Sequence, residues 1–308
     1  ISENTVVIFL TDNGPTTRHF TAGLRGQKGT VYEGGIRVPF FVRWPAKLRP
    51  EKVDRIAAHI DVLPTLLEAA GIDPPAGLKL DGASLMPLLV GDDGDWPERT
   101  LYIQWQRGDE PQLYGNFAAV SEQFKLVQSR TLGGPIRREP RFELYDIQAD
   151  PGEQTSIGGL RKAPLGQLKA GYERWFREVS VTRGYDPPRI VVGSEHENPV
   201  ILSRQDWRSL GAEGWSDRHL GYWEVEVATA GSYDIRFRFS TQTRAGRAEF
   251  RLGKVKLRKP FTRSAESVTF REVELDAGPA RLDARLVRGG KTVGVKYIDV
   301  TRLDEPSL

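Results

Sequence analysis

A continuous apolar run close to the first residue constrains the fold of this chain more than any other segment. Val6 to Leu10 are apolar at successive positions, and the run is followed by Asp12, Asn13 and Gly14. A strand that is apolar on both faces must be covered on both faces. Parallel strands in α/β proteins are typically covered in this way. We therefore predict a central strand of an α/β sheet, whose neighbouring strands are missing from this chain.

Asp12 and Asn13 follow the carboxyl end of this strand, which is where α/β sheets bind ligands. Both side chains offer the hard oxygen atoms that Ca²⁺ and Mg²⁺ prefer. An Asn-Gly pair is also the commonest short hairpin signal, so these residues alone leave a turn as the alternative. No alternating partner strand follows Gly14, and this favours a metal site. Such a site needs further ligands from elsewhere.

The glycine-rich loop from Pro15 to Gly35 is a second candidate site. It carries Arg25 and Lys28 among glycines, and Arg37 follows it. Point charges and backbone N–H groups in such a loop suit a tetrahedral oxyanion. A surface loop of solvated cations is the alternative that composition leaves open.

Helical spacing and short strand signals organise the rest of the first part of the chain. Asp61 is a natural N-cap for a helix over Val62–Ala70, and Gly71 fits its end. Short apolar strands between glycine and proline turns predict a small antiparallel sheet, with a later helix packed on it. The predicted strands are Thr100–Gln106, Phe117–Val120, Lys125–Gln128 and Glu143–Asp146, and the predicted helix is Leu165–Val179.

The pattern changes at residues 183–188, a predicted linker. Beyond it, apolar residues alternate strictly with polar ones, as they do from Trp223 to Val227. Many short two-faced strands predict a β-sandwich. The predicted fold class is therefore α/β (a partial sheet) with a small antiparallel α+β subdomain, followed by an all-β, jelly-roll-like sandwich. The predicted domains are residues 1–98, 99–182 and 188–308.

Composition excludes several classes of function. The net charge of +3 over 308 residues is too small to indicate nucleic acid. Residues 181–308 hold 22 basic and 18 acidic side chains, which hints at an anionic partner. The chain has no cysteine and hence no thiol nucleophile. It has neither an initiator Met, a signal peptide nor an apolar stretch of membrane-spanning length.

Four blocks in order closely resemble the C-terminal half of the sulfatases, the arylsulfatase-type members of the alkaline-phosphatase-like superfamily. The blocks are NTVVIFLTDNGP, GLRGQKGTVYEGGIRVPFFVRWP, HIDVLPTLLEAAG and ELYDIQADPGEQ. The resemblance covers about residues 4–180. It implies a partial alkaline-phosphatase-like sheet and a sulfuric ester hydrolase.

The resemblance also implies roles for single residues. Asp12 and Asn13 match an Asp-Asn pair that completes a Ca²⁺ site, whose other acidic ligands come from the N-terminal end of the family. Lys28 matches a lysine that contacts the sulfate ester oxygens, where its charge favours the anionic transition state. Arg25 is a further candidate for substrate binding.

Three other residues of the matching blocks have less specific roles. Glu33 and Arg37 are expected to be structural first. His59 is expected to satisfy a local hydrogen bond rather than to act in catalysis.

The chain also departs from the sulfatase pattern. Sulfatases use a formylglycine made from Cys or Ser in a C/S-x-P/A-x-R signature, and this nucleophile is absent from the chain. The early Asp-Asp metal pair is absent as well. We therefore expect an incomplete Ca²⁺ site, an inactive chain when alone, and the missing N-terminal half of the same enzyme as its partner. The expected substrate is a sulfated ester, for which a polysaccharide is the favoured class, in a periplasmic or secreted location.

Two alternative functions stay open. One is a phosphoric or phosphonic monoester hydrolase of the same superfamily. The other is a non-catalytic glycan-binding protein, because the predicted sandwich loosely resembles the carbohydrate-binding jelly rolls of polysaccharide-active enzymes. Trp207 and Trp215 are the candidates for stacking on sugars. Core packing is the alternative for both, and it is favoured for Trp223, which alternates with polar residues.

Overall fold

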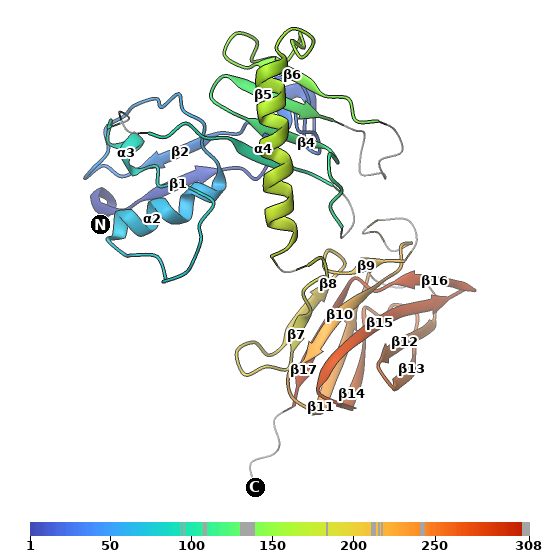
Figure 1. Ribbon diagram of the computed structural model, residues 1–308. Coiled ribbons are helices and arrows are strands. Elements are labelled where there is room, and N and C mark those ends of the chain that lie inside the picture. Colours follow the sequence, from blue (N-terminus) through green and yellow to red (C-terminus); the bar gives the residue numbers. More distant parts are fainter. Residues whose placement is uncertain are drawn as a thin grey trace. The chain divides into compact units, whose positions relative to one another are not determined.

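The chain folds into two compact units, residues 1–185 and 186–308 (Figure 1). The computed structural model describes residues 1–92, 94, 96–106, 110–129, 139–182, 184–210, 214, 216, 218–240 and 244–303. Each unit has its own hydrophobic core. None of the helices in these ranges is long and apolar enough to cross a membrane.

The apolar run near the start forms β1 (Val7–Leu10), which pairs antiparallel with β2 (Phe40–Arg43). The partner of β1 within this chain is therefore antiparallel, and the parallel neighbours that we predict outside the chain stay a prediction. Val7, Phe9 and Phe41 expose 48%, 56% and 66% of their surface. The apolar pattern describes two faces that are suited to burial, and in this structure no residue of β1 is fully buried.

The predicted helix after Asp61 is confirmed as α2 (Val62–Ala70). It ends at Gly71, whose φ of +66° lies in the left-handed region that favours glycine. Asp61 stands at the predicted N-cap position of α2, but its side chain makes no capping hydrogen bond to the helix. Short helical turns complete this part of the unit: η1 (Ser2–Asn4), η2 (Arg18–Phe20), α1 (Glu33–Ile36), η3 (His59–Asp61) and α3 (Met86–Leu89).

The predicted small antiparallel sheet is confirmed, with the order β3-β4-β5-β6. Helix α4 (Lys162–Ser180) packs on one face through Leu168 and Tyr172. Val31 and Tyr32 pack on the other face, so the central strands are buried on both sides. The glycine-rich loop is thus tied to this sheet. The strands are β3 (Leu101–Gln104), β4 (Phe117–Val120), β5 (Phe124–Gln128) and β6 (Glu143–Asp146).

The second unit, called the β unit below, consists of two sheets that share one core. One sheet follows the path β13-β12-β15-β10-β7, with β16 on β15 and β9 on β10, and the other has the order β14-β11-β17-β8. Only the β7–β10 pair is parallel among the described pairings. The strands are β7 (Ile190–Val192), β8 (Val200–Ser203), β9 (Arg208–Ser209), β10 (Gly221–Val227), β11 (Gly231–Arg238), β12 (Gly246–Leu252), β13 (Val255–Phe261), β14 (Ser267–Leu275), β15 (Gly278–Arg288), β16 (Lys291–Gly294) and β17 (Tyr297–Arg302).

The predicted alternation of buried and exposed residues is confirmed in these strands. In β10, Trp223, Val225 and Val227 are buried and the residues between them are not. The core therefore lies between the two sheets, and the side chains that alternate with the core residues of β10 are less buried. The jelly-roll class of this unit stays a prediction.

Candidate functional site

The turn from Asp12 to Gly14 lies directly after β1 and is held against the glycine pair at the start of α1. The Gly14 N–H donates to the Gly35 carbonyl at 2.8 Å. A Cβ atom at Gly14 would lie 2.0 Å from the Gly34 carbonyl oxygen, so only glycine fits there. The Asp12 side chain is exposed and Asn13 is half-buried. The backbone of the turn is thus fixed while its carboxylate stays at the surface.

Lys28 lies on a loop that is joined to the same turn. Its backbone N–H donates to the Pro15 carbonyl at 2.9 Å, one residue beyond Gly14. The Lys28 side chain is exposed, and among the described residues no ion pair engages its ammonium group. Two backbone hydrogen bonds therefore bring the loops of Asp12, Asn13 and Lys28 together.

The two oxygen donors of the turn do not make a metal site by themselves. In the described ranges, no group of three or more His, Asp or Glu side chains could hold a metal ion. The Asp12 carboxylate and Asn13 amide suit Ca²⁺ chemically, but Ca²⁺ takes about six to eight oxygen ligands. The donor set therefore fits Ca²⁺ in kind and falls short of it in number.

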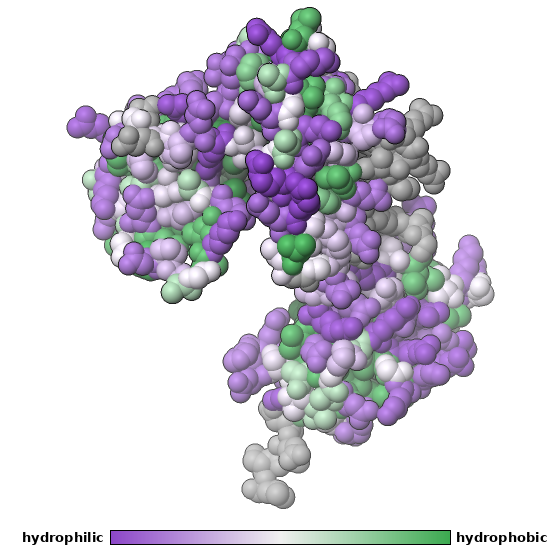
Figure 2. Space-filling model, in the orientation of Figure 1, coloured by the Kyte–Doolittle hydropathy of each residue, from purple (hydrophilic) through white to green (hydrophobic). Residues whose placement is uncertain are grey.

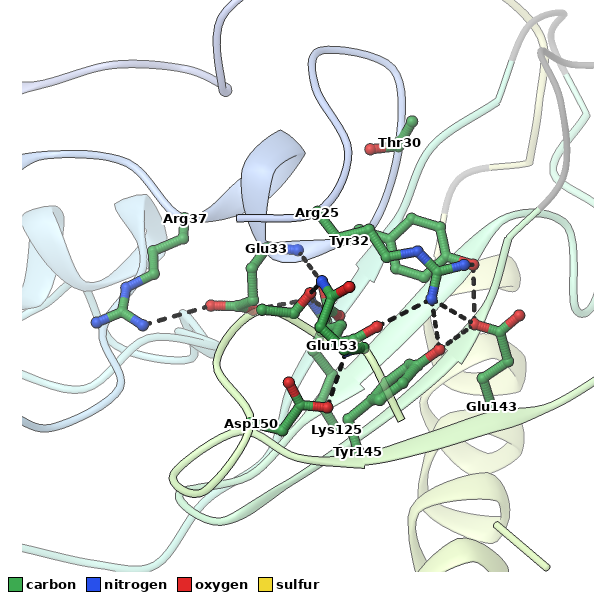
Figure 3. A network of polar contacts seen from close by, with 12 residues as sticks. Arg25, Thr30, Tyr32, Glu33, Arg37, Lys125, Glu143, Tyr145, Asp150 and Glu153 are labelled. Carbon is green, nitrogen blue, oxygen red and sulfur yellow. Dashed lines mark hydrogen bonds and ion pairs between the residues drawn. The ribbon is translucent and has the colours of Figure 1, made fainter. Parts of the chain in front are cut away.

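Arg25 is engaged within the protein (Figure 3). Its Nη1 donates to the Tyr145 hydroxyl at 2.6 Å and to the Glu153 carbonyl at 3.1 Å, and Nη2 donates to the Tyr32 hydroxyl at 3.0 Å. Glu143 accepts from Arg25 at 3.4 Å and from both tyrosine hydroxyls. In the structure, Arg25 therefore anchors the loop to the four-stranded sheet, and its role in substrate binding stays a prediction.

The two tyrosines of this network stay neutral over the ordinary pH range. Burial, together with the hydrogen bond to the Glu143 carboxylate, raises the pKa of Tyr32 to about 12. The same two causes, burial first, raise the pKa of Tyr145. Both hydroxyls therefore remain hydrogen-bond donors to Glu143.

A buried ion cluster of Glu33, Lys125 and Glu153 lies beside this network (Figure 3). The Lys125 Nζ atom is 2.7 Å from Glu33 Oε1 and 2.9 Å from Glu153 Oε1, and Lys125 and Glu153 are fully buried. The Glu33 backbone N–H donates to Glu153 Oε2 at 2.6 Å. Burial raises the pKa of Glu153, and the charge of Lys125 opposes this rise. Arg37 approaches the outer oxygen of Glu33 at 3.7 Å, which fits the structural roles expected for Glu33 and Arg37.

Sequence reasoning did not find the cluster, although one signal was available. Lys125 stands at an inward position of β5, between Phe124 and the buried Leu126. A lysine at such a position needs buried partners, because an isolated buried charge is costly. The partners come from residues 33 and 153, far away in the sequence.

A second buried charge pair lies at the start of α2. Arg99 binds both carboxylate oxygens of Asp61, at 2.9 and 2.5 Å, and Asp61 is fully buried. The backbone N–H groups of Ala58 and Ala83 also donate to Asp61. His59 is exposed in η3. Asp61 thus joins three segments. In the described part of the chain, the His59 side chain makes no hydrogen bond or ion pair, so the expected local hydrogen bond is not seen.

The candidate sugar-stacking residues fall in different environments. Trp207 is 6% exposed, lies in the core of the β unit next to Trp223, and donates from Nε1 to the Gly214 carbonyl at 3.2 Å. This burial leaves no open ring face, so the predicted stacking role does not fit Trp207. Trp215 lies outside the described residues. The core assignment of Trp223 is confirmed by its 0% exposure.

Comparison with known proteins agrees with the blocks around this site. Residues 26–165 match the family described as N-sulphoglucosamine sulphohydrolase, C-terminal. The chain is 35% identical to human arylsulfatase A over 217 residues, which are 60% of this chain and 42% of that protein. It is 29% identical to the N-acetylgalactosamine-6-O-sulfatase of Bacteroides thetaiotaomicron, over 51% of this chain and 33% of that protein.

A solved structure supports the same fold. The crystal structure of Ps i-CgsB in complex with k-i-k-neocarrahexaose superposes with a TM-score of 0.50 at 22% identity, over 60% of this chain and 39% of that chain. The chain spans less than half the length of these relatives. Its first unit is similar to the C-terminal region of sulfatases.

Proposed function

We propose that this chain is the C-terminal portion of a sulfuric ester hydrolase that works with formylglycine and Ca²⁺. The observation that carries the proposal is the joining of the Asp12–Asn13 turn to the Lys28 loop by the Gly14–Gly35 and Lys28–Pro15 hydrogen bonds. These bonds hold two hard oxygen donors and an exposed cation on neighbouring loops. Such a combination suits a tetrahedral oxyanion and its counter-ion.

Each of these residues has a distinct part in the proposal. Asp12 and Asn13 would supply two ligands of a Ca²⁺ ion, which in a sulfatase offsets the charge of the sulfate group while formylglycine supplies the attacking oxygen. Lys28 would place its ammonium group against the sulfate ester oxygens. There it stabilises the negative charge that builds up on the leaving oxygen.

The rest of the site would come from the N-terminal half of the same enzyme. The exposed apolar side chains of β1 and β2 support this, because Val7, Phe9 and Phe41 each expose about half of their surface or more. Exposed apolar surface of this kind marks an interaction site. The named activity of the Bacteroides relative supports a sulfated sugar as substrate. A periplasmic or secreted location stays a prediction.

Sulfate ester hydrolysis tests this proposal. The chain as given, incubated with 4-nitrophenyl sulfate and Ca²⁺, is expected to show no turnover. The longer polypeptide encoded with the reading frame upstream of Ile1 is expected to contain a C/S-x-P/A-x-R segment and to be active. Sulfate release by the chain alone, above the level of its Lys28→Ala variant, would contradict the incomplete site.

The role of Lys28 has a matched control in the same unit. In the active polypeptide, Lys28→Ala is expected to lower kcat by about 10²- to 10³-fold, the cost of losing one oxyanion-stabilising group. Lys79, another exposed lysine of this unit, is expected to tolerate Lys79→Ala without loss. Equal activity of the two variants would show that Lys28 is not part of the site.

Faster turnover of 4-nitrophenyl phosphate than of 4-nitrophenyl sulfate would assign the enzyme to phosphoric ester hydrolysis.

A further inference from the structure

The β unit carries a surface of concentrated positive charge on the outer side of its larger sheet. Three adjacent strands, β13, β12 and β15, present cationic side chains at the positions that alternate with the buried core residues. Figure 2 shows hydrophilic residues over the part of this unit where β10 and β15 lie. The basic face, as we call it, consists of Arg247, Arg251, Lys256, Arg258, Arg281 and Arg285.

Two carboxylates within the basic face hold its arginines in place. Asp283, whose side chain is 10% exposed, lies 2.9 Å from Arg281 and 3.9 Å from Arg285. Glu249, whose side chain is 22% exposed, lies 2.7 Å from Arg247 and 3.5 Å from Arg258 in the same way. Each carboxylate is shared by two guanidinium groups, so positive charge remains in excess.

Two further cations of the basic face are directed to solvent. Arg251 and Lys256 face each other across β12 and β13 and are exposed. Among the described residues neither makes an ion pair. The six cations and two carboxylates give the basic face a net charge of about +4.

The charge is confined to this part of the β unit. On the same sheet, β10 presents Glu224 and Glu226 beside β15, which bounds the basic face on that side. The outer side of the smaller sheet is balanced. Its three arginines are matched by at least three carboxylates, and these residues are Arg236, Arg238, Arg271, Asp234, Glu274 and Asp299.

We propose that the basic face binds a linear sulfated polysaccharide. Neighbouring strands lie about 4.8 Å apart, and alternate residues of one strand about 6.8 Å apart, so cations are repeated at short intervals along and across the strands. A polymer with a sulfate group on each short repeat meets such an array at several points at once. Five of the six cations are arginines, whose forked donors bind oxyanions through two hydrogen bonds. The choice of polymer rests on the proposed function, whereas the anionic character of the ligand rests on the charges alone.

Arg281 extends this surface toward an aromatic ring. Its guanidinium carbon lies 3.7 Å from the centroid of the Tyr222 ring, a distance at which a cation is attracted to the ring face. The contact keeps the Arg281 side chain close to the sheet. It leaves the side chain 45% exposed to a bound polymer.

Titration calorimetry of the whole chain with dextran sulfate tests the proposal. We expect binding that weakens as salt is added, because exposed charges are screened. The double variant Arg251→Gln/Lys256→Gln is expected to raise the Kd about tenfold, which equals about 1.4 kcal/mol. The matched control, Arg236→Gln/Arg271→Gln, removes the same charge from the smaller sheet and is expected to leave the Kd unchanged.

Other polymers decide the class of ligand. Uncharged dextran is expected not to bind, and polyuridylic acid is expected to bind more weakly than dextran sulfate. Equal losses in the two double variants, no binding by the wild-type chain, or tighter binding of the RNA would each overturn the proposal. Because no ester is hydrolysed in these titrations, their failure leaves the outcome of the sulfatase assay untouched, and the reverse also holds.

Discussion

Replacement of Lys125 by Met tests the importance of the buried cluster that ties the glycine-rich loop to the four-stranded sheet. In the wild-type chain, Lys125 is the only lysine within 3 Å of the Glu33 and Glu153 carboxylates in the described residues, at 2.7 and 2.9 Å. Met has nearly the same length and shape. The substitution therefore removes the charge and leaves the packing largely intact.

The expected cost follows from the two carboxylates that lose their partner. Removing one member of a buried ion pair destabilises a protein by about 3 to 5 kcal/mol, because a charge is left buried and uncompensated. Glu33 retains Arg37 at 3.7 Å, and Glu153 retains the Glu33 N–H at 2.6 Å. We therefore expect the free energy of unfolding of the first unit to fall by about 3 to 4 kcal/mol at pH 7.5.

The loss is expected to depend on pH in one direction. Burial raises the pKa of Glu153 in the folded chain above its value in the unfolded chain. Ionisation of Glu153 in the folded chain therefore lowers the free energy of unfolding. This loss develops as the pH rises through the folded-state pKa. Without Lys125 the pKa rises further. The deficit of Lys125→Met is therefore largest near pH 7.5 and shrinks as the pH falls toward about 4.3, the ordinary pKa of a glutamate.

Urea unfolding at pH 7.5 and pH 5.5 measures these effects, with hydrogen exchange of the β5 amides to assign the transition to the first unit. The second-site change Glu153→Gln is expected to recover part of the lost stability of Lys125→Met. The control Lys52→Met removes an exposed lysine, 83% accessible and paired with Asp54, and is expected to change nothing measurable. A Lys125→Met chain as stable as the wild type, or a deficit that grows on acidification, would refute this reasoning.

Three further substitutions test other parts of the structure. Gly14→Ala places a Cβ atom 2.0 Å from the Gly34 carbonyl and is expected to cost about 1 to 3 kcal/mol in urea unfolding by overpacking; an unchanged midpoint would show that the turn is not held there. Arg99→Leu leaves the fully buried Asp61 carboxylate without its cation, and is expected to cost about 3 to 5 kcal/mol, most of which Asp61→Asn in the same chain should restore. Trp207→Ala empties a core position of the β unit and is expected to lower the free energy of unfolding of this unit by about 3 to 5 kcal/mol. Dextran sulfate binding, measured at a temperature below the thermal transition, is expected to stay intact. Loss of binding in a folded variant would show that Trp207 takes part in sugar binding.

Local pattern was sufficient to predict much of the secondary structure. Helix α2 begins and ends as the spacing and Gly71 predict, and the strands of the four-stranded sheet lie within a residue or two of the predicted ranges or inside them. The alternation in the β unit matches the observed burial in β10 and β11. These features depend on which side of a helix or strand is apolar, and that is written in consecutive residues.

Pattern was not sufficient for the partners of β1. Five apolar residues in a row indicate two faces suited to burial, and parallel neighbours are the usual reason for such a run. The structure pairs β1 antiparallel with β2 and leaves Phe9 56% exposed. A run of apolar residues indicates how much surface of a strand is suited to burial. It does not indicate which other segment covers that surface.

The sequence by itself therefore indicated the resemblance to sulfatases, the order of secondary structure and the residues Asp12, Asn13 and Lys28 as a group worth testing. Only the tertiary structure decided what the charged residues do. Arg25 donates hydrogen bonds to Tyr32 and Tyr145, and Lys125 is paired with carboxylates 92 and 28 residues away. The physical reason is that apolar periodicity is a property of neighbouring residues. The partner of a buried charge is set by which distant segments fold against each other, and no local pattern contains that information.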